Sequence, residues 1–312
     1  MDKTVYEKRR YKMVGSHSAV KLCTWTRNSL VGKGHCYKEE FYNVKSHRCL
    51  QMTPVVAWCE HSCLFCWRPC EFTQGTSMKD VKIDEPEDII NNAVEAQRKL
   101  LIGFKGNDKT PKKMYEEAIN PNQAAISLAG EPTLYPKING LLDIFKKKNF
   151  TTFLVTNGMN PKVLEQLSPL PTQLYITLVA GNPKDYAKIT NSCYKEKGFQ
   201  RLLDSINVMK SLNTRKVLRL TLVKDYNMKN PGEYAKIIEN SGCDFVEAKA
   251  YMHVGSSIER LGRENMPSFS EIKIFSKNLA DELGWKIIDE QEVSRVCLIA
   301  KEDYSWRKIN KD

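Results

Sequence analysis

The sequence lacks the features that would place it in a membrane or outside the cell. It has no run of eighteen apolar residues, and its start, MDKTVYEKRRYK, is charged with no apolar segment behind it. A membrane span and a secretory signal both need such a segment. Internal repeats and low-complexity linkers are also missing. We therefore expect a cytoplasmic protein that forms one contiguous unit.

Acidic residues are outnumbered. The chain has 37 Asp and Glu residues against 48 Lys and Arg, so its formal net charge is +11 at pH 7. An excess of this size points to a polyanionic partner, and nucleic acid is the first candidate. The alternative is that the charge only keeps the protein soluble, because net charge alone identifies no site.

Ten cysteines are present in the chain. Because the cytosol keeps thiols reduced, they favour metal ligation over disulfides. Cys59, Cys63 and Cys66 form a Cys-x3-Cys-x2-Cys array. Three thiolates on a four-iron cluster leave one iron open to a second molecule. Zinc is the alternative, and it would need a fourth ligand from His61 or Cys70.

A second cysteine series precedes this array. Cys23, Cys36 and Cys49 follow one another at intervals of thirteen residues. Three ligands again leave an iron open, so the series predicts a second cluster. A zinc site that includes His35 or His47 is the competing interpretation.

The two cysteine series together resemble a known family. The first array, with the aromatic Phe65 before its last cysteine, resembles the signature of radical S-adenosylmethionine (radical SAM) enzymes. With the second series ahead of it, the chain resembles the tRNA 4-demethylwyosine synthases of the wybutosine pathway, in the archaeal form without a flavodoxin domain. The resemblance runs through HSAVKLCTW, CYKEEFY, HRCLQMTPVVAWC, CLFCWRP, ISLAGEPTLYP, TTFLVTNGM, QLYITL, YMHVGSS and SRVCLIA.

The resemblance implies a carbon–carbon bond-forming, lyase-type enzyme. It would convert N1-methylguanosine-37 of tRNA(Phe) and pyruvate into 4-demethylwyosine (imG-14). It also implies two [4Fe-4S] clusters, one on each cysteine series, with S-adenosyl-L-methionine bound at the open iron of the first. Because the chain has no flavodoxin-like segment, a separate electron donor of the flavodoxin or ferredoxin type is implied. We expect a monomer with no membrane partner.

Strand-like and helix-like runs alternate after the first array, which predicts a parallel α/β sheet. The resemblance narrows this to a partial (β/α)6 TIM-like barrel of the radical SAM type with N- and C-terminal extensions. We assign residues 1–53 to the segment with the second cluster, 54–255 to the barrel and 256–312 to a C-terminal extension. The apolar run 54–58 predicts a buried strand. Right-handed crossovers would place both clusters at the C-terminal ends of the strands, with the N-terminal segment over that opening.

Several residues are candidates for cofactor binding. By resemblance, Gly130 and Glu131 of the turn AGEPT hold the amino group of S-adenosylmethionine, although Ala129 replaces the family's first Gly. Asn157, Thr177 and Arg219 belong to strand ends or strands that face a barrel opening. A turn for Asn157 and an exposed salt bridge for Arg219 are the alternatives. Relatives commonly carry Ser and Asp where this chain has Thr177 and Val179.

Pyruvate needs an anchor, and two routes are open. One is chelation to the open iron of the second cluster, and the other is a Schiff base with Lys38 or Lys21. Two rival functions also remain. A radical SAM enzyme acting on a different RNA or protein would not need the second cysteine series. A non-enzymatic iron–sulfur regulator that binds nucleic acid would have no use for the AGEPT turn.

Overall fold

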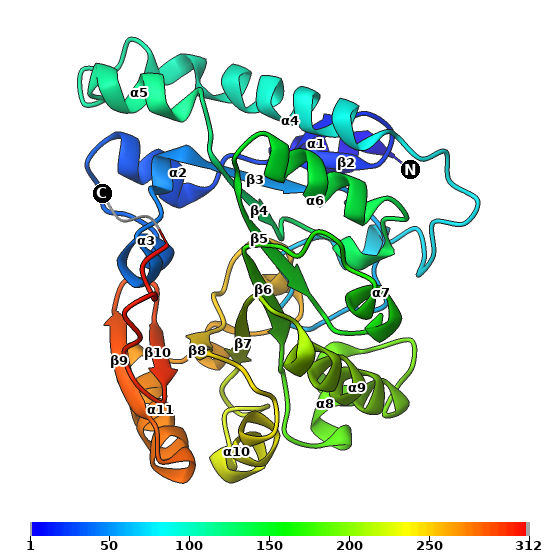
Figure 1. Cartoon of the computed structure of the whole chain (residues 1–312), viewed down its shortest axis with the longest axis vertical. Coiled ribbons are helices and arrows are strands. Elements are labelled where there is room, and N and C mark those ends of the chain that lie inside the picture. Colours follow the sequence, from blue (N-terminus) through cyan, green and yellow to red (C-terminus); the bar gives the residue numbers. More distant parts are fainter. Residues whose placement is uncertain (1, 310–312) are drawn as a thin grey trace.

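A curved sheet of ten strands forms the centre of the molecule (Figure 1). The computed structural model describes residues 2–309. Its six central strands are parallel to one another, and their order in the sheet follows their order in the sequence. The predicted partial (β/α)6 barrel is therefore confirmed. These strands are β3 (Cys49–Thr53), β4 (Gln123–Ile126), β5 (Thr151–Thr156), β6 (Gln173–Thr177), β7 (Arg215–Leu222) and β8 (Phe245–Ala250).

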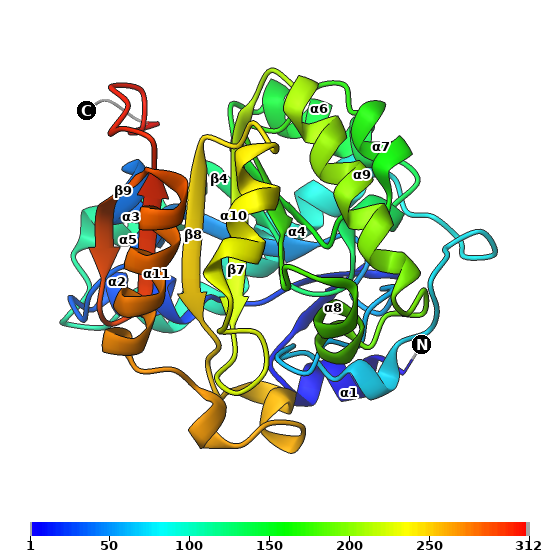
Figure 2. The ribbon, with the colours of Figure 1, turned by 90° about the horizontal axis from the view of Figure 1, so that it is seen from below.

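Amphipathic helices connect these strands and bury their apolar sides in a continuous core. In α11 the side chain of Ser268 accepts a hydrogen bond from Glu271 N and Gly284 takes a positive φ, so a capping box begins the helix and a glycine ends it. Figure 2 shows α7 beside α9, and α10 packs against α11. The helices are α4 (Pro86–Leu101), α5 (Lys112–Ala118), α6 (Ile138–Lys147), α7 (Pro161–Glu165), α8 (Pro183–Thr190), α9 (Lys197–Ser211), α10 (Pro231–Glu239) and α11 (Phe269–Leu283).

The N-terminal segment extends the sheet and fills part of its inner face. Strand β2 pairs antiparallel with both β1 and β3. Tyr37, Phe41 and Tyr42 of α3 are buried against Phe153 and Tyr175 of the barrel. The expected boundary between residues 53 and 54 follows the last residue of β3, so it assigns the first barrel strand to the N-terminal segment. The elements before β3 are α1 (Lys3–Lys8), β1 (Lys12–Val14), β2 (Ser18–Val20), α2 (Thr24–Leu30) and α3 (Tyr37–Tyr42).

Two sequence-based expectations for this region are wrong. The first barrel strand is β3, whereas residues 54–58 form a buried turn. The ladder ends there because Pro54 has no N–H to donate. The two cysteine series also do not share one end of the sheet. Cys49 begins β3, and Cys59 lies beyond the end of the same strand, so the strand itself separates them.

The C-terminal region continues the same sheet. Strand β10 (Val296–Ala300) pairs antiparallel with β8, and β9 (Lys286–Gln291) pairs antiparallel with β10. All five residues of β10 are buried. Over residues 2–309, we find no helix with the length and apolar character needed to cross a membrane.

Candidate active site

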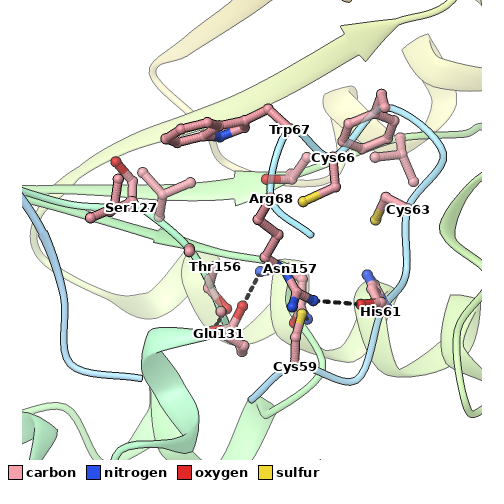
Figure 3. A pocket seen from close by; sticks show the side chains of 17 residues that line it. Cys59, His61, Cys63, Cys66, Trp67, Arg68, Ser127, Glu131, Thr156 and Asn157 are labelled. Carbon is pink, nitrogen blue, oxygen red and sulfur yellow. Dashed lines mark hydrogen bonds between the residues drawn. The ribbon is translucent and has the colours of Figure 1, made fainter. Parts of the chain in front are cut away.

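The three cysteines of the first array lie in one loop after β3, and all three line the same cavity (Figure 3). Backbone hydrogen bonds hold this loop against the end of α8, from Ser62 N to Thr190 O (3.0 Å) and from Leu64 N to Ile189 O (2.9 Å). The thiols therefore converge because the loop is fixed at its middle.

The opposite wall of the cavity consists of the C-terminal ends of β4, β5 and β6. The cavity encloses about 710 Å³ free of protein atoms, a volume that includes space open to solvent. Four of the five predicted cofactor residues are on this wall, namely Gly130, Glu131, Asn157 and Thr177, together with Val179. The fifth, Arg219, is elsewhere.

Gly130 allows the turn after β4 to approach the cysteine loop. Its φ is +68°, and a Cβ at this position would lie 1.7 Å from the carbonyl oxygen of Val55. Only glycine combines this left-handed conformation with such a close approach. The next amide, Glu131 N, donates to Trp58 O at 2.8 Å. The turn and the cysteine loop are thereby joined.

The Glu131 carboxylate is buried and held in one orientation. Its Oε1 accepts from Thr133 N (3.0 Å), Thr133 Oγ1 (2.6 Å) and Thr156 Oγ1 (2.7 Å), and its Oε2 accepts from Asn157 N (2.7 Å). Oε2 thus keeps capacity for one more donor, such as an ammonium group. Burial and the nearby Glu60 carboxylate raise the pKa of Glu131.

Asn157 links the strand ends to the cysteine loop. Its Nδ2 donates to Glu60 Oε2 at 3.1 Å and lies 3.8 Å from Cys59 Sγ. Its Oδ1 accepts from Met159 N at 2.9 Å. Both interpretations of this Asn therefore apply, since it forms a local turn and also faces the thiol array.

The second cysteine series gathers around Lys38. Cys23 and Cys36 are the N-caps of α2 and α3, and Cys49 is the first residue of β3. Burial raises the pKa of Cys36 to about 11 and that of Cys49 to about 12, with Cys23 adding to both shifts and Lys38 opposing them. The sequence-distant thiols are thus close enough to interact electrostatically with one another and with this lysine.

Lys38 is half-buried between aromatic rings. Its Nζ is 4.3 Å from the ring centroid of Phe153 on β5 and 4.6 Å from that of Tyr175 on β6. Burial and the nearby Arg219 lower its pKa to about 8. The other candidate, Lys21, lies elsewhere, with its Nζ 4.7 Å from the ring centroids of both Tyr11 and Trp67.

The geometry of Arg219 corrects its predicted role. Its guanidinium pairs with Glu247 Oε2 at 3.0 Å and lies 4.4 Å above the ring centroid of Tyr175. Glu247 is fully buried and also accepts from the hydroxyls of Tyr37 and Tyr42. Arg219 therefore belongs to the chamber around Lys38 and does not line the cavity of the first array. The exposed salt bridge is equally wrong, because this pair is internal.

The histidines considered as zinc ligands have other partners. His61 Nε2 is 2.8 Å from the Tyr186 hydroxyl, and His47 Nε2 is 2.6 Å from Glu117 Oε2. Within the part of the chain that the structure describes, no group of three His, Cys, Asp or Glu side chains is arranged to hold a metal ion. A single zinc needs its thiolates at about 2.3 Å, whereas a four-iron cubane spreads its ligands more widely. The three cysteines of the first array, which line one cavity, are a donor set that a four-iron cluster could use.

Trp67 and Arg68 are among the cavity residues that were not identified from the sequence. Trp67 and Arg68 directly follow Cys66, and both line the cavity. Trp67 stacks on Tyr11 with ring centroids 5.8 Å apart and an interplanar angle of 18°. Their position beside the last cysteine was the available signal, but the sequence does not reveal that the loop folds back over the thiols.

Two family models match the chain. The model of the radical SAM superfamily matches residues 53–238, and the model of wyosine base formation matches residues 241–301.

Several named relatives resemble the chain over nearly its full length. It is 49% identical over 303 residues to the S-adenosyl-L-methionine-dependent tRNA 4-demethylwyosine synthase of Pyrococcus horikoshii, covering 96% of this chain and 88% of that protein. The protein of the same name from Methanocaldococcus jannaschii is 38% identical over 310 residues, covering 98% and 96%.

Two solved structures share the fold. A structure of TYW1 with a lysine–pyruvate adduct bound has a TM-score of 0.88 and 36% identity, covering 98% of this chain and 97% of that one. A crystal structure of archaeal TYW1 has a TM-score of 0.80 and 33% identity, covering 98% and 96%.

Proposed function

Because the chain belongs to the S-adenosyl-L-methionine-dependent tRNA 4-demethylwyosine synthases, a family of radical SAM enzymes, we propose that it joins pyruvate to N1-methylguanosine-37 of tRNA(Phe) to form 4-demethylwyosine. The proposal assigns one [4Fe-4S] cluster to Cys59, Cys63 and Cys66 and a second to Cys23, Cys36 and Cys49. A separate flavodoxin- or ferredoxin-type protein supplies electrons. When bound and reduced, a cluster held by Cys59, Cys63 and Cys66 would supply the electron for the reductive cleavage of S-adenosylmethionine, whose radical fragment would take hydrogen from the N1-methyl group.

The observation that carries this proposal is the position of Lys38 relative to the cofactor cavity. Side chains two residues apart on a strand point to the same face. Val155 and Thr177 line the cavity, and Lys38 contacts Phe153 and Tyr175, which precede them by two residues on β5 and β6. Two residues of extended strand, roughly 7 Å, therefore separate the lysine site from the cavity wall. A three-carbon acid held at Lys38 would lie beside the cofactor.

Lys38 can anchor pyruvate by a covalent bond. Its amine attacks the ketone carbon, one water leaves, and a protonated C=N bond remains. The solved relative with a lysine–pyruvate adduct supports this route. The carbon radical on the substrate then adds to the former ketone carbon, which leaves the unpaired electron on the Lys38 nitrogen. The bond to the carboxyl carbon breaks, the C=N bond re-forms, and the carboxyl carbon leaves as a radical anion that becomes formate by taking one electron from the separate donor protein and one proton. The exocyclic amine of the guanine then adds to the C=N carbon and releases the Lys38 amine, which closes the ring.

The Glu131 carboxylate has the free capacity to accept from the ammonium group of S-adenosylmethionine, and Thr177 offers a hydroxyl on the same wall. Asn157 fixes the orientation of Glu131 through its backbone N–H. We retain these residues and Gly130 as the cofactor site. We reassign Arg219 to the support of the Lys38 chamber.

The tRNA has to present its base at the rim of the cavity. Trp67 lies on the cavity wall, and its carbonyl accepts from Ser256 N at 3.0 Å. On the same segment, Val254 and Ile258 are exposed large apolar residues. Enzymes that modify bases inside a stacked loop extrude the base and pack it against apolar or aromatic side chains. We assign the entry of the base to this rim.

Reduction with borohydride in the presence of pyruvate tests the covalent route. Peptide mapping of the wild type should find the adduct on Lys38, and Lys38→Met should abolish it. Lys249→Met is the matched control, because burial also lowers the pKa of Lys249 to about 8 and its Nζ lies 5.2 Å from the ring centroid of Tyr37, next to Lys38. An adduct on Lys249 or Lys21, or none at all, would sink the assignment of Lys38.

The complete reaction needs its own assay. Anaerobically reconstituted protein, dithionite, S-adenosylmethionine, pyruvate and tRNA(Phe) with N1-methylguanosine-37 should give 4-demethylwyosine, detected by mass spectrometry of the nucleosides. The matched substrate is the same tRNA with unmodified guanosine-37, which should remain unchanged because it lacks the methyl group from which hydrogen is taken. Cleavage of S-adenosylmethionine without any change in the methylated tRNA would favour a different substrate.

A further inference from the structure

Arg68 is a buried cation without a carboxylate partner. Only 2% of the surface of this residue is exposed to solvent. Its Nη1 donates to Thr73 Oγ1 at 2.8 Å and its Nη2 donates to His61 O at 2.9 Å, and both acceptors are neutral. Within residues 2–309, no salt bridge to Arg68 is found. A buried charge normally needs a countercharge, because its removal from water costs several kcal/mol.

The countercharge available to Arg68 is the thiol array. Arg68 lines the same cavity as the three cysteines, and its bond to His61 O places the guanidinium inside the loop between Cys59 and Cys63 (Figure 3). A guanidinium keeps its proton throughout the pH range in which proteins are folded. The guanidinium is therefore permanently charged.

We propose that Arg68 tunes the cluster of the first array, because its fixed positive charge offsets the thiolates and makes the one-electron reduction of the cluster easier. The inference rests on the proposed cluster at Cys59, Cys63 and Cys66, but it does not depend on the tRNA or pyruvate.

The sign of the effect follows from the charge balance. Reduction adds one electron to the cluster from an outside low-potential donor, and no bond to Arg68 forms or breaks. The added negative charge is stabilised by a nearby cation, and salt screens a buried pair far less than an exposed one. Net charge and hydrogen bonding are established controls of iron–sulfur potentials. Loss of the Arg68 charge should therefore shift the midpoint potential to more negative values.

The test compares a neutral variant with a charge-retaining one. Full-length wild type, Arg68→Gln and Arg68→Lys are reconstituted anaerobically, their iron is counted, and each is titrated with dithionite while the reduced cluster is followed by EPR. Addition of S-adenosylmethionine identifies the signal of the first cluster, because that ligand perturbs the cluster it binds. Arg201→Met is the matched control, since Arg201 also donates to a backbone carbonyl, Met159 O, at 2.9 and 2.7 Å.

We expect Arg68→Gln to lower the ratio of reduced to oxidised cluster about tenfold at a fixed potential, about 59 mV for a one-electron couple. Arg68→Lys should lie closer to the wild type, and Arg201→Met should match it. Loss of the cluster from Arg68→Gln but not from Arg68→Lys would also support a role for the charge. Equal potentials in all four proteins, or the same change in both Arg68 variants, would overturn the inference. A wild type without iron on the first array would instead refute the proposed cluster.

Discussion

The Nζ of Lys38 lies 4.6 Å from the centroid of the Tyr175 ring, on the inner face of the barrel. Lys38 comes from the N-terminal segment and Tyr175 from the fourth parallel strand, so the contact joins parts of the chain that are far apart in sequence. Thr177, two residues beyond Tyr175, is on the wall of the cofactor cavity. The N-terminal segment therefore lies close to the cavity of the first cysteine array.

The second cysteine series can be tested by iron analysis. We expect about eight irons per reconstituted chain in the wild type and about four when Cys23, Cys36 and Cys49 are all changed to Ala, because each cubane holds four irons. Sulfide should fall in parallel. A chain with Cys193, Cys243 and Cys297 changed to Ala is the matched control and should keep about eight. About four irons in all three proteins would refute a second cluster on Cys23, Cys36 and Cys49.

Replacement of Gly130 by Ala should disrupt the cofactor turn. The left-handed backbone costs about 1–2 kcal/mol for a residue with a Cβ, and the approach to Val55 O adds a clash that the rigid backbone cannot relieve. We expect a loss of at least about 3 kcal/mol in the free energy of unfolding, measured with urea.

Gly284→Ala is the control for Gly130→Ala. Gly284 has a φ of +63°, yet a Cβ there would meet nothing within 4 Å. It should therefore lose only about 1 kcal/mol. Equal losses in the two variants would show that the approach to Val55 does not matter.

The buried pair of Arg219 and Glu247 should be essential for stability. Either Arg219→Met or Glu247→Leu leaves an uncompensated buried charge, so each should cost about 3–5 kcal/mol in unfolding free energy. The double variant should lose clearly less than the sum of the two, because it leaves no unpaired charge. Urea denaturation of the wild type, the two single variants and the double variant measures this double-mutant cycle. Additive losses would mean that the pair does not act as a unit.

Binding of S-adenosylmethionine should weaken as the pH falls. Glu131 must be ionised to accept from an ammonium group, and burial beside Glu60 raises its pKa. As the pH falls, Glu131 therefore begins to take up its proton while the pH is still above about 5, where an ordinary Glu is ionised. Calorimetry across this range should show the dissociation constant rising toward acid in the wild type. Glu131→Gln should bind weakly with little change across the same range, and an equal pH response in both would assign the effect to another group.

Binding of tRNA should depend strongly on salt. The net charge of +11 predicts that basic residues displace counterions from phosphates, so affinity falls as salt rises. Between 50 and 200 mM salt we expect a loss of at least about tenfold, measured by fluorescence anisotropy. A response below twofold would show that the excess charge serves another purpose.

Local sequence patterns predicted a parallel α/β sheet, and the family resemblance narrowed it to a partial (β/α)6 barrel. The ends of helix α11 are marked in the sequence, because Ser268 begins its capping box and Gly284 ends it. The short helices α2 and α3 were not predicted, because their buried residues pack against distant strands. Arg219 shows the same limit. Its alternation on β7 placed it on the inner face, but only the fold brings Glu247 beside it on β8, with Arg219 and Glu247 in register.

The candidate site was also predicted only in part from the sequence. Cysteine spacing identified six thiols, since spacing is a property of the sequence. Two features exist only in the folded chain. One is the burial of Arg68 without a carboxylate partner, and the other is the short distance between Lys38 and the cavity.

Strand β3 acts as a spacer of fixed length between the two cysteine series. Four steps separate Cys49 from Thr53, which is about 13 Å of extended chain. Hydrogen bonds to β2 and β4 on both sides prevent this spacing from stretching. The deletion of one residue would shorten it by about 3.3 Å and turn the side chains on one side of the cut to the opposite face. The covalent length of this strand, and not only its side chains, thus sets how the two ends of the chamber meet.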